Sequence, residues 1–172
     1  ARRARKAGAE VYRNTPVTGL TQHKDHNWTV HTEHGDIDCE VVVNACGYRV
    51  NEVGAMMGVH HPVASMEHQY FLTEDIPAIA EACHIPSAYL AKIINTLART
   101  IPGKRNAFCI IGLRAGLGEG GGQGWLLAQQ IVHGEACYDT WCLDPRRFTG
   151  HANVELTALK AVEDYQNEFR FH

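Results

Sequence analysis

"GLRAGLGEGGGQGWLLAQQIVHGE", residues 112–135, holds eight of the 16 glycines of the chain within 24 residues and ends in an apolar run with helical spacing. The run "NAFCIIGL", residues 106–113, leads into it and has the character of a buried strand. A flexible linker would have polar, non-periodic flanks, whereas this segment lies between an apolar strand and an apolar helix. We therefore predict a ligand-binding loop followed by a helix that starts near Gly124 or Trp125. The free N–H groups and the dipole at such a helix start favour negative charge.

The composition is that of a globular protein. The chain has 172 residues, of which 45% are hydrophobic and 20% charged, so we expect one domain or at most two. A formal net charge of -3 gives no electrostatic footprint for nucleic acid, and no apolar run approaches the roughly 18 residues of a membrane span. We predict a soluble protein without a nucleic-acid or membrane partner.

Six scattered cysteines without a CxxC pair favour a reducing compartment. We predict a cytoplasmic location, with the mitochondrial matrix as the alternative. The basic opening "ARRARKAG" has no apolar stretch after it, so a secretory signal does not fit. The C-terminal turn of a helix, with Gly8 as its C′ residue, explains it better than a transit peptide does.

Short β-rich runs follow Gly8 and predict a strand and then an antiparallel meander. Polar or turn residues separate them at Lys24–Asn27 and at Gly35–Asp36. The uniformly apolar "VVV" of residues 41–43 predicts a strand covered on both faces, and the small residues after it leave space for a ligand. The runs are centred on Val11, Val17–Leu20, Trp28–Thr32 and Ile37–Val43.

Further elements are expected along the rest of the chain. They are a helical turn at Glu52–Met57, a strand at Gln69–Leu72, two helical pieces within residues 76–103 broken at Pro86, and a surface helix at Glu155–Glu168. The fold class is therefore α/β (α+β), with a β-meander, central parallel strands and flanking helices. Residues 1–150 would form the main domain, and residues 151–172 a helical extension.

The glycine segment also contains a literal GxGxxG, "GLGEGG", at Gly116–Gly121. A dinucleotide fingerprint needs a second parallel strand that ends in an acidic residue about 20 positions later. Asp139 and Asp144 follow the helix, but no apolar strand precedes them. An NAD-binding module stays open as an interpretation, and another kind of cofactor contact is favoured.

The 11 histidines do not form a metal motif. Alternation along the expected hairpin spreads four of them over two faces, and two neighbours would point apart in a strand. No HExxH or CxxC is present, so no metal site is predicted. The six residues in question are His23, His26, His31, His34, His60 and His61.

Two blocks of the sequence carry a family likeness. The first is "GAEVYRNTPVTGL…WTVHTEHGDIDCEVVVNACGYRVNEVGAMMG" with "HHPVASMEHQYFLTE", and the second is "NAFCIIGLRAGLGEGGGQGWLLAQQIVHGEACYDTWCLDPRRF". They resemble FAD-dependent amine oxidoreductases of the D-amino-acid-oxidase superfamily, closest to dimethylglycine and sarcosine dehydrogenases. The resemblance implies FAD as cofactor and hydride transfer from the N-methyl carbon of a secondary or tertiary amino acid, of the dimethylglycine or sarcosine type, to flavin N5. Oxygen or an electron-acceptor protein would then take the electrons.

The resemblance also implies cofactor contacts. The backbone of Val17 would meet the FAD adenine, and Asn44 would begin a second cofactor-facing strand end that continues through Ala45, Cys46 and Gly47. The loop 113–122 would lie along the flavin pyrimidine edge, where amides favour the reduced, anionic ring. Its implied cofactor residues are Leu113, Arg114, Gly116, Leu117, Gly118, Gly121 and Gly122.

Candidate catalytic residues lie in "EHQYFLTE", residues 67–74. Strand alternation places His68 and Tyr70 on the same side, where they could face a substrate pocket. Arg114 is a candidate clamp for the substrate carboxylate.

The likeness has gaps. The family's opening strand and phosphate-binding loop have no counterpart, residues 84–100 do not resemble the family, and the folate-associated domains of the dehydrogenases are missing. We therefore interpret the chain as a fragment with an internal deletion or a mis-joined reading frame. The alternative function is a truncated, non-catalytic domain that serves only as a binding or structural piece.

Overall fold

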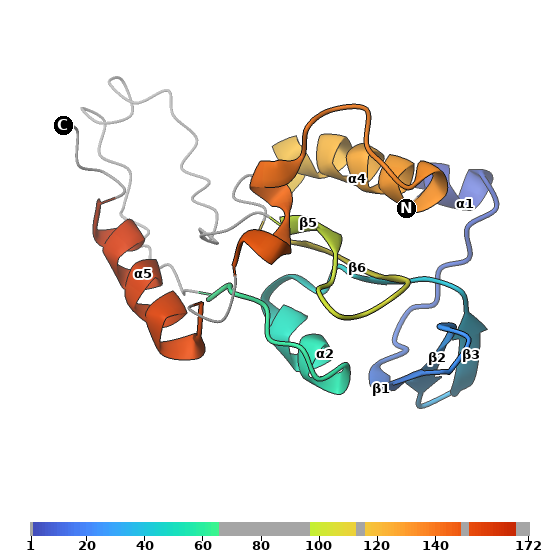
Figure 1. Cartoon of the computed structure of the whole chain (residues 1–172). Helices are drawn as coiled ribbons and strands as arrows, with labels where there is room; N and C mark the ends of the chain where they lie inside the picture. Colours follow the sequence, from blue (N-terminus) through green and yellow to red (C-terminus); the bar gives the residue numbers. More distant parts are fainter. Residues whose placement is uncertain (1, 66–96, 113–115, 149–151, 168–172) are drawn as a thin grey trace, which may run out of the picture.

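The structure is a computed structural model that describes residues 2–65, 97–112, 116–148 and 152–167. It contains two three-stranded sheets, of which the second lies near the centre of the molecule and the first to one side of it (Figure 1). Helix α4 covers the second sheet, and helix α5 lies at the side of the molecule away from the first sheet. The two sheets and α4 are what position the candidate site.

The first sheet is a three-stranded antiparallel meander in the order β1-β2-β3. This confirms the predicted meander. The turn between the last two strands falls at Glu33–His34, and not at Gly35–Asp36 as predicted, because Gly35 (φ 124) already begins the third strand. The strands are β1 (Val17–Gln22), β2 (Trp28–Thr32) and β3 (Gly35–Cys39).

The segment before the meander is a short helix and an extended stretch. Helix α1 (Arg2–Lys6) is followed by Gly8 as the predicted C′ residue, whose φ is 95°. The Ala9 N–H donates to the Ala4 carbonyl over 3.0 Å, which is a Schellman cap. The run around Val11 is no strand.

The second sheet has the order β4-β6-β5. β4 (Val42–Asn44) pairs in parallel with β6 (Ala107–Ile111), and β5 (Leu97–Thr100) pairs with β6 in antiparallel orientation. The predicted buried strand in "NAFCIIGL" is thus confirmed. Parallel strands and flanking helices together give the predicted α/β class.

The run Ile37–Val43 is not one strand. Residues up to Cys39 complete the meander, a bend follows at Glu40, and β4 belongs to the second sheet. The expectation that "VVV" is covered on both faces is wrong as well, because Val43 is 41% exposed while Val42 is buried. The three-residue β4 therefore has one covered face and one open face.

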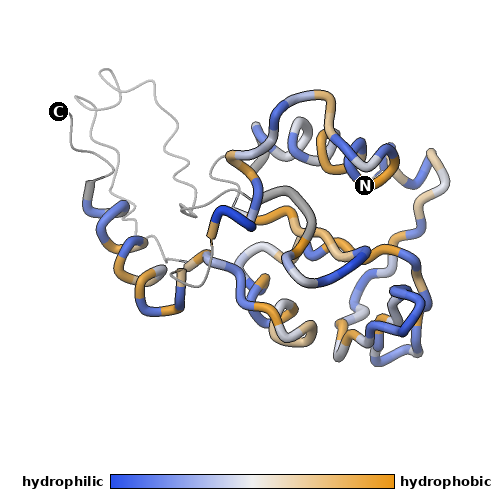
Figure 2. The backbone as a smooth tube through the Cα atoms, in the orientation of Figure 1, coloured by the Kyte–Doolittle hydropathy of each residue, from blue (hydrophilic) through white to orange (hydrophobic). Residues whose placement is uncertain are grey.

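The hydrophobic core joins the two sheets. The Trp28 indole is 1% exposed, and its Nε1–H donates to the Arg105 carbonyl over 3.1 Å. Gln22 donates to the same carbonyl over 2.8 Å, so the turn before β6 is fastened to the meander. In Figure 2 the β6 segment is orange and the meander mostly blue. The core residues are Trp28, Val42, Val50, Met57, Val63, Ile101, Ala107, Cys109 and Ile111.

The helices confirm some predictions and correct others. The turn predicted at Glu52–Met57 and the predicted surface helix at Glu155–Glu168 are present. The predicted helical piece that ends residues 76–103 is wrong at 97–100, which form β5, and the predicted strand at Gln69–Leu72 lies outside the described residues. The helical elements after α1 are η1 (Gly47–Arg49), α2 (Val50–Met56), α4 (Gly116–His133), η2 (Trp141–Leu143), η3 (Pro145–Arg147) and α5 (Val154–Asn167).

Helix α4 begins at Gly116, eight residues before the predicted start at Gly124. The glycine segment is therefore helical from its second glycine onward, despite the low helix propensity of glycine. The position of α4 over the second sheet therefore outweighs the low helix propensity of its glycines.

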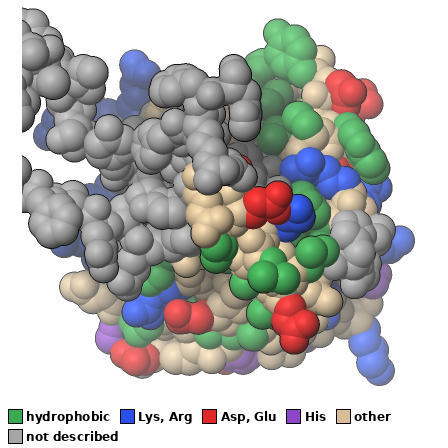
Figure 3. Space-filling view, turned by 90° about the vertical axis from the view of Figure 1, so that its left-hand side faces the viewer, with side chains coloured by type: hydrophobic (Ala, Val, Ile, Leu, Met, Phe, Trp, Pro, Cys, Tyr) green, Lys and Arg blue, Asp and Glu red, His purple; other side chains and the backbone are tan. Residues whose placement is uncertain are grey.

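Helix α5 buries some of its apolar side chains and exposes others. Ala161 is buried, whereas Val154 and Leu159 are 62% and 67% exposed. On the side of the molecule where α5 lies, hydrophobic, acidic and basic side chains are mixed (Figure 3). No helix in the described ranges is long and apolar enough to cross a membrane.

Candidate cofactor site

The carboxyl ends of two parallel strands define the candidate site. Asn44 of β4 lies opposite Cys109 of β6 in parallel register. The turn Ala45–Gly47 and the start of α4 therefore leave the sheet at the same edge, which we call the carboxyl edge. Open α/β sheets bind their ligands at this kind of edge.

The turn after β4 exposes its backbone. Ala45, Cys46 and Gly47 are all exposed, and Gly47 has a φ of 57°, in the left-handed region that favours glycine. A Cβ built on Gly47 meets nothing within 4 Å, so the space beside the turn is open. Small side chains and an open flank allow a flat ring system to approach this turn.

The start of α4 supplies further amides. The first N–H groups of a helix have no partner within the helix, and Gly116, Leu117 and Gly118 occupy this first turn. Positive dipole charge gathers at the same place and favours an electron-rich ligand. Glu119 also lies in the first turn and opposes that effect by its own charge.

The expected loop through Gly122 is wrong, because α4 contains those residues. Gly121 and Gly122 lie in the second turn, where N–H groups donate to carbonyls four residues earlier. Their amides are not free for a cofactor, although a Cβ at either would meet nothing within 4 Å. Of the predicted amide donors, those of the first turn remain.

The GxGxxG of Gly116–Gly121 is contradicted as a dinucleotide fingerprint. In such a fingerprint the glycines form the turn between a strand and a helix. Here all of its glycines are inside α4. The NAD-binding interpretation therefore loses its motif.

The other predicted residues divide into two groups. Val17 is the first residue of β1 and is 37% exposed. It therefore belongs to the first sheet, whereas the turn Ala45–Gly47 follows β4 of the second sheet. The predicted catalytic residues His68 and Tyr70, and the loop residues Leu113 and Arg114, lie outside the described residues.

Two residues beside the turn were missed. Tyr48 is 72% exposed, and the guanidinium carbon of Arg49 lies 5.6 Å from its ring centroid. Arg49 Nε donates to the Tyr48 hydroxyl over 3.3 Å, and this bond raises the pKa of the guanidinium, with a further contribution from the charge of Glu52. An exposed ring and a cation at the carboxyl edge suit an aromatic or anionic ligand. The letters "GYR" directly after a strand end were the available signal.

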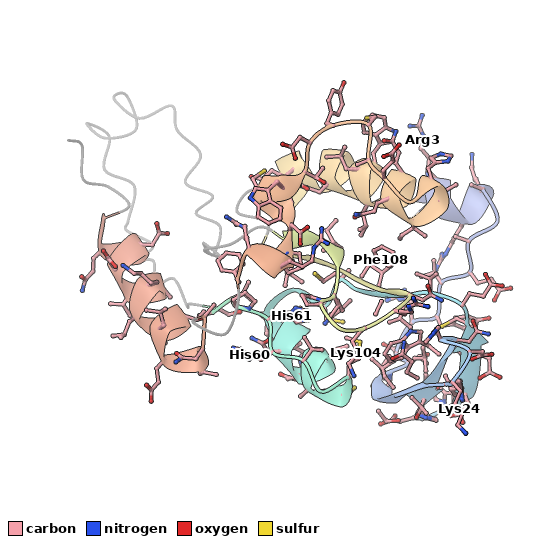
Figure 4. All side chains as sticks on the ribbon, in the orientation of Figure 1. Arg3, Lys24, His60, His61, Lys104 and Phe108 are labelled. Carbon is pink, nitrogen blue, oxygen red and sulfur yellow. The ribbon has the colours of Figure 1, made fainter. Side chains whose placement is uncertain are left out.

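A buried polar pair behind the turn was also missed. Asn44 and His61 are each 1% exposed, and Asn44 Nδ2 lies 3.3 Å from His61 Nε2. Burial, with a smaller contribution from the neighbouring His60, lowers the pKa of His61 to about 4. Figure 4 shows both histidines beside α2.

Two cavities lined by described residues are candidates for a binding site. The larger, about 820 Å³, includes the turn 102–106 before β6 and the C-terminal part of α4, so it lies at the opposite edge of the sheet. The smaller, about 240 Å³, is lined by Tyr48, Asn51, His60 and the first turns of α5. We assign the cofactor edge by topology and free amides rather than by cavity size. Within the described ranges, no three His, Cys, Asp or Glu side chains are grouped to hold a metal.

The chain is similar in sequence to two mitochondrial dehydrogenases. It is 26% identical to the mitochondrial dimethylglycine dehydrogenase of Mus musculus over 244 residues, a match that covers 94% of this chain and 28% of the relative. It is 40% identical to the mitochondrial sarcosine dehydrogenase of Homo sapiens over 84 residues, which is 46% of this chain and 9% of the relative. The chain thus spans little more than a quarter of the length of the first relative. The 244-residue alignment is also longer than the chain, so it includes positions without a counterpart here.

The fold has a solved counterpart. L-proline dehydrogenase from P. horikoshii superposes with a TM-score of 0.66 at 17% identity, over 86% of this chain and 57% of that structure. The family model for FAD dependent oxidoreductases matches residues 1–103, more than half of the chain. This chain belongs to the family of FAD-dependent oxidoreductases.

Proposed function

We propose that this chain forms part of the FAD site of an enzyme that oxidises the N-methyl C–N bond of a small amino acid such as dimethylglycine or sarcosine. The observation that carries the proposal is the parallel pairing of β4 with β6, which brings an open turn and a helix start to one edge. The names of the two dehydrogenases to which the chain is similar support the substrate class.

The residues of this edge fit a flavin. The exposed turn Ala45–Gly47 has no bulky side chain, and the first turn of α4 offers free N–H groups to electron-rich atoms. FAD, when bound, supplies the redox chemistry by taking up a hydride from the N-methyl carbon. The role of the chain is to hold the ring, keep its electron-rich edge against amides, and orient the substrate.

Three residues outside the described ranges complete the proposal. His68 and Tyr70 would face the substrate, and Arg114 would hold its carboxylate through two N–H groups. Arg114→Lys removes the bidentate geometry but keeps the charge. We expect this variant to raise the KM for the amino acid by about tenfold with little change in kcat, because the lost contact holds ground state and transition state alike.

The second candidate function is a non-catalytic domain. It is favoured by one observation: Gly121 and Gly122 lie inside α4, so fewer free amides are left for a cofactor than the sequence predicted. In that case the fold would persist without turning over an amine. The two candidates differ in whether a bound flavin is reduced.

The deciding experiment is anaerobic reduction. The purified chain is loaded with FAD and mixed with dimethylglycine, sarcosine or trimethylglycine while the flavin absorbance is followed. The first two substrates should bleach the flavin band. Trimethylglycine is the matched control, because its nitrogen has no lone pair to support loss of a hydride from carbon. Bound FAD that no amine bleaches would support the non-catalytic candidate instead.

The location remains a proposal as well. Both dehydrogenases to which the chain is similar are mitochondrial by name, which supports the mitochondrial matrix over the cytoplasm. Fractionation of cells that express the natural gene with a C-terminal tag tests this directly.

A further inference from the structure

A buried polar cluster lies behind the turn that we assign to the cofactor. Asn44, the last residue of β4, directly precedes the exposed residues Ala45–Gly47, and its side chain is buried. His61 comes from the loop after α2 and is equally buried. Buried polar side chains are costly unless every one of their polar atoms is paired, so each bond in the cluster constrains the others.

The hydrogen bonds of Asn44 fix the orientation of its amide. Nδ2 donates to the Val50 carbonyl over 3.0 Å and lies 3.3 Å from His61 Nε2. Oδ1 accepts from the backbone N–H of Cys46 at 3.4 Å. Because an amide nitrogen only donates, His61 Nε2 must accept, and the ring proton must then be on Nδ1. The amide cannot turn over without losing the bond to the exposed turn.

Helix α2 holds His61 in place. The Asn51 carboxamide accepts from the His61 N–H over 2.7 Å and donates to the Val63 carbonyl over 3.2 Å. A Cβ on Gly54 would lie 3.0 Å from His61 Cδ2 and 2.7 Å from the Val59 carbonyl oxygen, so only glycine leaves room for the ring. Two residues of α2 therefore fix His61: Gly54 leaves space for its ring, and Asn51 binds its backbone N–H.

We propose that His61 is a positioning residue of the cofactor site. Its neutral ring accepts from Asn44, and Asn44 in turn fixes the Cys46 amide and thereby the course of the turn Ala45–Gly47. The inference rests on the proposed function, since that function assigns the turn to the flavin. His61 is buried behind the turn, so it acts through Asn44 and not on the substrate.

The neutral state of the ring agrees with this role. Burial and the neighbouring His60 keep the pKa of His61 near 4, so the ring is uncharged at pH 7. A protonated ring would place an N–H against the N–H of Asn44. The contact is therefore specific for one charge state and one tautomer.

Three variants of the full 172-residue chain test the proposal. His61→Gln keeps an acceptor for Asn44, His61→Leu removes it, and the exposed neighbour His60→Leu is the matched control. The backbone amide signals of Cys46 and Gly47 are followed by NMR without FAD, and the FAD dissociation constant by quenching of flavin fluorescence. His61→Leu should move both amide signals and raise the dissociation constant about tenfold, the size expected for one unpaired buried donor. His61→Gln should stay within about threefold of the parent, and His60→Leu should match it.

A purely structural histidine would not show rescue by Gln together with a local change at Cys46. The proposal is overturned if folded His61→Leu keeps the Cys46 and Gly47 signals of the parent. If His61→Leu does not fold, the tautomer of the parent decides: long-range ¹⁵N spectra should show the proton on Nδ1, and a proton on Nε2 overturns the proposal. A parent chain that does not bind FAD overturns the proposed function, whereas the amide and tautomer measurements need no FAD and judge the His61 contact separately.

Discussion

Asn44 and Cys109 face each other across the only parallel strand pair in the part of the chain that the structure describes. This register sends the turn Ala45–Gly47 and the first turn of α4 out of the same sheet edge. Everything proposed about the cofactor depends on that juxtaposition. The larger cavity, at the other end of β6, has no such pair of strand ends beside it.

Gly54→Ala should destabilise the chain. Alanine normally stabilises a helix by up to about 1 kcal/mol relative to glycine. At Gly54 the new methyl group would lie 2.7 Å from the Val59 carbonyl oxygen and 3.0 Å from His61, and His61 cannot move without breaking its hydrogen bonds to Asn44 and Asn51. We expect a net loss of about 1–3 kcal/mol in the free energy of unfolding, the range typical of overpacking. Urea denaturation followed by circular dichroism measures it, and an unchanged or higher midpoint would contradict the packing around His61.

Gly122→Ala should have the opposite effect. Gly122 lies in α4, and a Cβ there meets nothing within 4 Å. The helix should gain about 0.5–1 kcal/mol in the absence of FAD, because alanine loses less backbone entropy than glycine. The same urea titration compares this variant with Gly54→Ala. Destabilisation by Gly122→Ala would mean that this face of α4 is packed against something in the folded chain.

The free energy of unfolding should decrease as the pH is lowered from about 6.5 to about 4. His61 has a pKa of about 4 in the folded chain against 6.5 for an unperturbed histidine. Between these values the unfolded chain binds a proton that the folded chain does not, so stability is complete above about pH 6.5 and decreases towards pH 4. The full contribution is at most about 3.5 kcal/mol, since one pKa unit corresponds to about 1.4 kcal/mol.

His61→Gln provides the comparison, because glutamine cannot take up the proton. Unfolding free energies at pH 7, 6, 5 and 4.5 should decline more steeply for the parent than for this variant. Equal slopes would show that another group causes the decline.

The meander and β6 were predictable because their signals are local. Alternating residues with polar turns mark the meander, and a short apolar run marks β6. The start of α4 was not predictable: glycine's low propensity argues for a loop, and only the packing of α4 over the second sheet favours a helix from Gly116. Figure 4 shows the Phe108 side chain on the side of β6 that faces α4.

The candidate site was predictable in part. Small residues after "VVV" indicated the turn Ala45–Gly47, and the family likeness pointed to the glycine segment. The exposure of Val43 and the break at Glu40 were not predicted, because residues 37–43 look like one strand but contribute to two different sheets. His61 escaped because its partner Asn44 is 17 residues away, and no spacing rule links a loop histidine to a strand asparagine.

The central claim, that FAD binds at the carboxyl edge, is tested most directly by an NMR titration of the ¹⁵N-labelled chain with FAD. The account predicts that amide shifts concentrate at Ala45–Gly47 and Gly116–Gly118 and that NAD at equal concentration leaves them unchanged. Shifts that instead concentrate around Lys104 and Arg105 in the larger cavity, or no saturable shift at all, would contradict it.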